Sequence, residues 1–168
     1  MGPFLRFEEA PARELVGLRM SMSFAGNLTP LLWRSFMPRR KEIVNNLNSD
    51  LISMQDYGKA MDFRNFDVHA RFDKWAVAEV ADFTVVPEGM ESYVLPAGLY
   101  AVFFHKGAAS TGEATFRYIF ETWMPSSGYV PDNRPHFEVL GAKYRNNDPD
   151  SEEEIWIPVK PVNLHGGW

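Results

Sequence analysis

The chain of 168 residues contains no cysteine. This absence excludes disulfide bonds, thiol nucleophiles, zinc–thiolate sites and iron–sulfur clusters, and it fits a reducing compartment. The start of the sequence has no apolar run of signal-peptide length. No uninterrupted apolar stretch approaches the roughly 20 residues that a membrane-spanning helix needs. We therefore expect a cytoplasmic protein that does not enter a membrane.

Positive charge and metal-binding patterns are also scarce. Lys and Arg number 17 against 22 Asp and Glu, so the formal net charge is −5. Without a basic surface or a helix-turn-helix with a basic recognition helix, we expect no direct binding of nucleic acid. The four histidines lack metal-ligand spacing, and the sequence has no Walker loop, GxGxxG or GxSxG motif. We expect neither a metal nor a cofactor.

Aromatic residues, in contrast, are abundant: 13 Phe, 6 Tyr and 5 Trp. Apolar residues make up 45% of the chain, which is typical of a globular protein. We expect residues 1–168 to form a single domain with a substantial core. Aromatic side chains fill such cores, but they also line pockets for flat or cationic ligands.

Hydrophobic periodicity predicts the same order of elements twice: a strand, a helix and two further strands. Thr29-Pro30 is typical of a helix start, and Pro38 predicts a kink or two abutting helical pieces. The run Pro125-Ser126-Ser127-Gly128 predicts the end of the second helix. We interpret the repetition as an internal duplication of a β-α-β-β unit, with repeats at about 5–83 and 96–161. The predicted class is α+β with antiparallel sheet. The predicted strands are residues 14–24, 51–57, 72–83, 99–105, 137–140 and 153–159.

Strand alternation places two Trp and two Glu residues on the faces that we expect to point away from the helices. These are Glu154 and Trp156 on the last strand, and Trp75 and Glu79 on the strand that closes the first repeat. A carboxylate beside aromatic rings suits a lipophilic cation, because the rings supply cation–π attraction and the carboxylate supplies the countercharge. Further candidates for the wall of such a pocket are Tyr100, Phe104 and Tyr118.

A simpler interpretation stays open. Both Trp residues can merely cover the sheet, and Glu154 belongs to an acidic run, residues 152–154, of the kind that is usually solvated. The opposite strand faces and the apolar stripes of the helices form the predicted core. Its members are Trp33, Phe36, Phe116, Ile119, Phe120, Ile155 and Ile157.

Several segments together resemble the GyrI-like, or AraC-type effector-binding, domain over roughly residues 5–161. They are LLWRSFMPRR at 31–40, KWAVAEV at 74–80, GLYAVFFHKG at 98–107, ETWMPSSGY at 121–129, FEVL at 137–140 and EEEIWIPV at 152–159. The resemblance implies a duplicated β-α-β-β fold with a ligand cleft between the repeats. It also implies an aromatic pocket with a glutamate as acidic anchor, which matches Glu154, with Glu79 equivalent in the first repeat.

The resemblance implies a small-molecule receptor for lipophilic or cationic aromatic compounds such as drugs, and we favour this function over an enzymatic one. Relatives of this kind also suggest two alternatives. One is a hydrolase of strained cyclopropane-containing drugs, with Glu154 as general acid/base and Tyr118 or Tyr144 as a second polar group. The other is an inhibitor that binds a partner enzyme such as gyrase.

Overall fold

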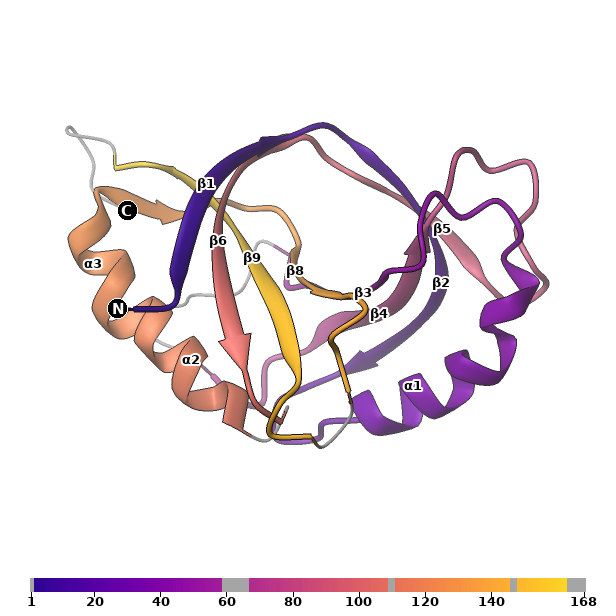
Figure 1. The fold of residues 1–168 in the computed structure, drawn as a ribbon, viewed down its shortest axis with the longest axis horizontal. Helices are drawn as coiled ribbons and strands as arrows, with labels where there is room; N and C mark the ends of the chain where they lie inside the picture. The colour runs from indigo at the N-terminus through magenta and orange to yellow at the C-terminus, as the bar shows by residue number, and fades with distance from the viewer. Residues whose placement is uncertain (1, 59–66, 109–110, 146–147, 163–168) are drawn as a thin grey trace.

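The protein has an α+β fold built on a mostly antiparallel sheet with two helical segments (Figure 1). The computed structural model describes residues 2–58, 67–108, 111–145 and 148–162. Its strands are β1 (Phe4–Ala10), β2 (Arg13–Met22), β3 (Leu51–Asp56), β4 (Phe72–Glu79), β5 (Glu91–Leu95), β6 (Gly98–Lys106), β7 (Tyr129–Pro131), β8 (His136–Leu140) and β9 (Glu152–Pro161). Its helices are α1 (Thr29–Phe36), a 3₁₀ segment η1 (Met37–Glu42), α2 (Gly112–Tyr118), a π-helical turn η3 (Ile119–Trp123) and α3 (Met124–Ser127).

The sheet runs in the order β1-β6-β9-β8-β3-β4-β2-β5, and β7 pairs with β9. The central strands β3 and β8 come from different halves of the sequence and pair with each other, with Ser53 opposite Glu138. The element order β2-α1-β3-β4 is followed later by β6-α2-β8-β9. An internal duplication with repeats at 5–83 and 96–161 stays a prediction.

Each of the six predicted strands corresponds to an observed strand, with ends shifted by at most four residues. Sequence periodicity missed β1, β5 and β7; β1 and β5 lie at the two edges of the sheet. Pro38 marks the change from α-helix to 3₁₀ helix, as predicted. The second helical segment ends within the predicted run 125–128, at Gly128, which has a φ of 81°. Pro125 itself occupies the first turn of α3, where a helix needs no amide donor.

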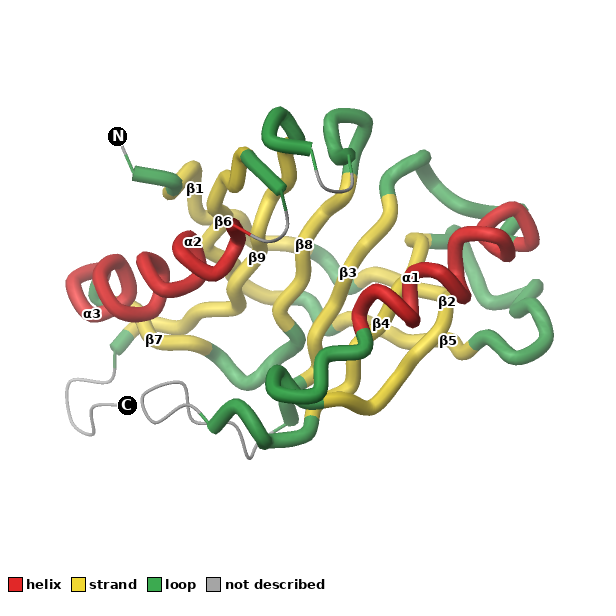
Figure 2. The backbone as a smooth tube through the Cα atoms, turned by 90° about the horizontal axis from the view of Figure 1, so that it is seen from below, coloured by secondary structure: helices red, strands yellow, loops and turns green. Residues whose placement is uncertain are grey.

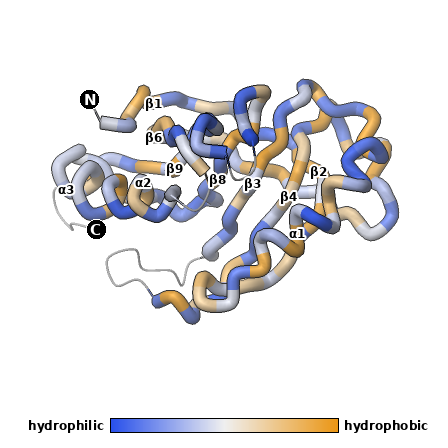
Figure 3. The backbone as a smooth tube through the Cα atoms, turned by 60° about the horizontal axis from the view of Figure 1, so that its bottom comes forward, coloured by the Kyte–Doolittle hydropathy of each residue, from blue (hydrophilic) through white to orange (hydrophobic). Residues whose placement is uncertain are grey.

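Both helical segments cover the same side of the sheet, which we call the helix side (Figure 2). Under α1, Leu32 and Phe36 pack on Ala76 and Ala78 of β4. Under α2 and α3, the apolar face of β9 packs against Ile119 and Met124. Figure 3 shows hydrophobic and hydrophilic stretches alternating along the strands and along α1, as this two-sided arrangement requires.

A bent two-stranded ribbon closes the other side of the sheet. Strands β1 and β2 follow each other in sequence but lie at opposite ends of the sheet, as do β5 and β6. Because β1 pairs with β6 and β2 pairs with β5, the four strands form one ribbon that bends at residues 11–12 and 96–97. Figure 1 shows β1 and β2 meeting in an arch at the top of the view. Ala10, Leu15 and Leu95 of this ribbon pack into the core of that side.

The predicted core is confirmed for four of its seven members: Phe36, Ile119, Ile155 and Ile157 are at most 1% exposed. The prediction was too strong for the other three. Trp33, Phe116 and Phe120 pack against the core clusters but keep part of their surface in solvent. Among the described helices, none is both long and apolar enough to cross a membrane.

Replacing Ile157 with Ala removes buried methyl groups from the layer between β9 and the α2–α3 segment. We expect this change to lower the free energy of unfolding by about 2–5 kcal/mol in urea denaturation. The matched control is Val94→Ala on β5, where the side chain is 55% exposed and the loss should stay within about 0.5 kcal/mol. Equal losses in the two variants would contradict the observed direction of the β9 side chains.

Candidate functional site

The helix side of the sheet is polar between the two helices. Strands β8 and β3 lie between the strands that α2 covers and those that α1 covers, and Figure 2 shows them between the two helices. Glu138 on β8 lies opposite Ile155 on β9, so the two side chains point to the same face of the sheet. Because Ile155 packs under the second helical segment, Glu138 also lies on the helix side. The buried polar residues here, none more than 9% exposed, are Ser53, Gln55, Lys74, His136 and Glu138. We call these five residues the central polar cluster.

Glu138 is the acidic residue of this cluster. Its Oε1 accepts a hydrogen bond of 3.0 Å from Nε2 of Gln55 and lies 3.8 Å from Nζ of Lys74. Its Oε2 is buried and has no hydrogen-bond partner among the described residues, and the same holds for Oε1 of Gln55. A buried polar atom without a partner is costly, so such an atom is a natural place for a polar group of a ligand.

Burial dominates the electrostatics of the cluster. It raises the pKa of Glu138, although Lys74 and Gln55 oppose this change. It lowers the pKa of Lys74, against the attraction of Glu138. On the adjacent strand β9, burial and the charge of Glu138 raise the pKa of Glu153 to about 7. Proton uptake at this site therefore falls within the physiological range.

Aromatic rings border the same cluster. Tyr57 meets His136 edge to face, with ring centroids 5.0 Å apart, and Phe120 stacks on His136 at 6.1 Å. Phe72 contacts Tyr57 at 5.2 Å. Burial and then Arg134 lower the pKa of His136 to about 3, so this imidazole is neutral near pH 7. The histidine two residues before Glu138 therefore adds no charge to the cluster, and its ring contacts Tyr57 and Phe120.

Three of the five aromatic members of the predicted pocket lie on the opposite side of the sheet. Trp75, Trp156 and Tyr100 belong to one cluster there and are each at most 5% exposed. Trp156 stacks on Phe137 at 5.2 Å and meets Tyr100 edge to face at 5.6 Å. Nε1 of Trp75 has no hydrogen-bond partner in the described part of the chain. The structure brings these predicted residues together as part of a packed core.

Glu154 lies beside this core, and an arginine already neutralises it. Its carboxylate accepts hydrogen bonds from Arg6 at 3.2 and 3.3 Å and from Nε1 of Trp156 at 3.1 Å. The guanidinium groups of Arg6 and Arg13 lie 5.6 and 4.9 Å from the centroid of the Trp156 ring. Arg6 and Arg13 therefore already supply the positive charge that the predicted pocket would take from a ligand cation.

The remaining predicted residues lie elsewhere. Glu79 is half-buried near the end of β4, opposite Leu15, and has no ion pair with any described residue. Phe104 and Tyr118 line a separate hollow of about 380 Å³ beside α2, together with Pro3. The seven predicted residues thus fall into three groups. Three are core residues on the side away from the helices, two are glutamates at the edge of that core, and two line this hollow. A single pocket formed by all of them stays a prediction.

Sequence reasoning missed the central polar cluster, although strand alternation carried a signal for it. Glu138 alternates with Phe137 and Val139, and Lys74 shares the face of Ala76, which lies under α1. Charged residues are rare on a strand face that helices bury, so these two positions could have indicated the cluster. Within the described residues, no group of three or more acidic or histidine side chains is placed to hold a metal ion.

The raised pKa of Glu153 predicts a pH dependence of stability. The folded state binds the proton more tightly than the unfolded state, so the stability that this proton contributes is full below about pH 4.5 and is lost as the pH rises to about 7. We expect Glu153→Gln to gain stability relative to the parent between pH 5 and pH 8, measured by urea denaturation. Glu121→Gln, at an exposed position on η3, should show no such pH-dependent gain. A constant difference between parent and Glu153→Gln across this range would contradict the assignment.

Comparisons with known proteins agree with this architecture. The chain is 32% identical over 155 residues to the transcriptional regulator BrlR of Pseudomonas aeruginosa, covering 92% of this chain and 54% of BrlR, so it spans about half of that protein. The structure of SAV2435 bound to tetraphenylphosphonium has the same fold, with a TM-score of 0.71 at 12% identity over 94% of this chain and 93% of that one. A hydrolase structure from Listeria innocua, encoded by lin2189, has a TM-score of 0.60 at 13% identity over 92% and 91% of the two chains.

The family model of the GyrI-like small-molecule-binding domain matches residues 4–160, nearly the whole chain. This match confirms the family that the sequence segments suggested. The chain belongs to the GyrI-like family of small-molecule-binding domains.

Proposed function

We propose that this domain is a receptor for lipophilic aromatic cations, which bind on the helix side above β3 and β8, with Glu138 as the acidic anchor. The observation that carries the proposal is the buried Oε2 of Glu138, which lacks a hydrogen-bond partner among the described residues. It belongs to a cluster that the aromatic ring of Tyr57 borders. A countercharge flanked by ring faces and edges is the arrangement that a delocalised cation requires.

Lys74 can change its charge when a ligand cation binds to Glu138. Its ammonium lies 3.8 Å from Glu138, which is too far for a hydrogen bond, and burial already disfavours its charged form. A ligand cation that approaches Oε2 repels the ammonium and favours the neutral amine. The ligand cation would thereby take over from the protonated Lys74 as the partner of the carboxylate. The buried negative charge of Glu138 is then compensated both in the free protein and in the complex.

Glu154 is the second carboxylate to consider, because the sequence pattern favoured it. Its ion pair with Arg6 would have to open before a ligand cation could use it. Glu138 pairs with Lys74 through Oε1, and its Oε2 has no partner among the described residues, so we favour Glu138. The two sites lie on opposite faces of one sheet, which makes them separable by mutation.

A hydrolytic function is the second candidate. The raised pKa of Glu138 is typical of a carboxylic acid that transfers protons in catalysis, and a strained cyclopropane-containing compound would need such an acid. One structure of similar fold is described as a hydrolase, and this likeness concerns the fold alone. The two functions differ in whether the ligand is recovered unchanged.

The test compares Glu138→Gln and Glu154→Gln in titrations with tetraphenylphosphonium, the compound bound to SAV2435. We expect Glu138→Gln to weaken binding at least about tenfold, or about 1.4 kcal/mol, while Glu154→Gln stays within about twofold of the parent. Neutral triphenylphosphine oxide should bind both variants alike, because the amide preserves shape. Binding of the cation to the parent should weaken as the pH falls through the raised pKa of Glu138.

Loss of binding in Glu154→Gln alone would move the site to the opposite side of the sheet. Equal binding by both variants and the parent would overturn the acidic-anchor proposal. Mass spectrometry of cyclopropane-containing compounds after incubation with the protein distinguishes a receptor from a hydrolase. Recovery of unchanged compound supports a receptor, and a product that gains one water molecule and disappears in Glu138→Gln supports the hydrolase.

A further inference from the structure

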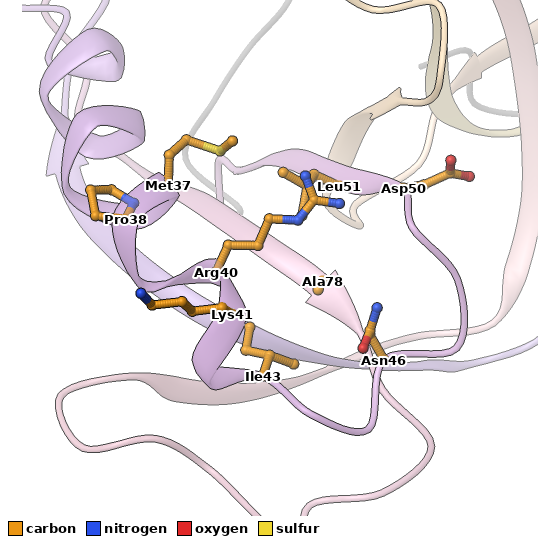
Figure 4. A pocket seen from close by; sticks show the side chains of 9 residues that line it. All are labelled: Met37, Pro38, Arg40, Lys41, Ile43, Asn46, Asp50, Leu51 and Ala78. Atoms are coloured by element: carbon orange, nitrogen blue, oxygen red, sulfur yellow. The ribbon is translucent and has the colours of Figure 1, made fainter.

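A second hollow, of about 360 Å³, opens on the helix side beside η1 (Figure 4). Its floor is apolar: Ile43, Leu51 and Ala78 face it and are each at most 6% exposed. Met37 and Pro38 form one wall. These side chains offer a small apolar body a surface that is already part of the core under α1.

Two cations, Arg40 and Lys41, line the same hollow. Neither has an acidic side chain within ion-pair distance among the described residues, whereas the neighbouring Arg39 is paired with Glu42 at 2.8 Å. Arg40 donates one hydrogen bond from Nη2 to the carbonyl of Ser49, which holds its side chain across the opening. Its other N–H groups have no partner in the described part of the chain and stay available to an anion.

The lining of this hollow is positively charged, whereas the whole chain is negatively charged. Asp50 is the one acidic residue in its lining, so the lining carries a net charge of +1 in a chain of net charge −5. Figure 4 shows the guanidinium of Arg40 extending from η1 toward Leu51, the ammonium of Lys41 pointing the other way, and the carboxylate of Asp50 pointing away from both. The Arg40 guanidinium can therefore receive a negative group, and Lys41 adds positive charge to the same lining.

We propose that this hollow binds a small organic anion with an apolar body, such as an aromatic carboxylate. The carboxylate lies on the guanidinium of Arg40, Lys41 adds positive charge at the rim, and the apolar body lies on Ile43, Leu51 and Ala78. The site is separate from the central polar cluster: Gln55 is four residues along β3 from Leu51, or roughly 13 Å. It also selects the opposite charge from the Glu138 site, so the two proposals stand independently.

The test uses methyl NMR spectra of the intact chain, because Met37, Ile43 and Leu51 report directly on the hollow. We expect 2-naphthoate to shift these methyl signals in a saturable way, and 2-naphthylmethylammonium to leave them nearly unchanged. Arg40→Gln with Lys41→Gln should weaken naphthoate binding about fivefold or more. Asp50→Asn, which removes the one negative charge and keeps the shape, should strengthen it about two- to threefold.

Two further variants keep the result interpretable. Lys41→Gln alone changes an exposed residue without touching the contact between Arg40 and Ser49, and it should weaken binding about two- to threefold. Arg34→Gln removes a positive charge from α1 outside the hollow and should leave binding unchanged. The proposal is overturned if naphthoate causes no saturable shift, if the ammonium analogue binds equally well, or if Arg34→Gln weakens binding as much as Lys41→Gln.

Discussion

The buried carboxylate of Glu138 is the interaction on which the centre of this molecule depends. A buried charge is tolerated only when other groups compensate it, and here the partners come from other strands: Gln55 from β3 and Lys74 from β4. The compensation therefore exists only when β8 pairs with β3 and brings the two halves of the sheet together. It is also incomplete, since Oε2 has no partner among the described residues. The same junction that joins the halves leaves a polar atom for a ligand.

Under the proposed function, the two sides of the sheet have different roles: one side stabilises the fold and the other binds the ligand. On the side away from the helices, the bent ribbon closes over Trp75, Trp156 and Tyr100, which are packed as core. On the helix side, α1 and the α2–α3 segment cover mainly the strands that flank β3 and β8, so most of the central region has polar and aromatic groups instead of a continuous apolar layer. Aromatic residues thus serve both purposes in one domain, and their number alone could not distinguish the two.

Period-two alternation predicted the faces of β4 and β9 correctly, because strand geometry alone determines which side chains share a side. It could not show which side is open to a ligand, since that depends on the order of strands and on the closing ribbon. The ion pair that neutralises Glu154 joins residues 148 positions apart, and no local pattern indicates it. The short edge strands β1 and β5 were missed for a related reason: they are stabilised mainly by their partners, β6 and β2.

The central claim is that Glu138 is the carboxylate that meets a ligand cation. The most direct measurement is the pKa of each glutamate carboxyl, followed by carbon-detected NMR titration with and without tetraphenylphosphonium. The account predicts that the cation lowers the raised pKa of Glu138, because it stabilises the charged form, and leaves the titration of Glu154 unchanged. A ligand-dependent shift at Glu154 with none at Glu138 would contradict it.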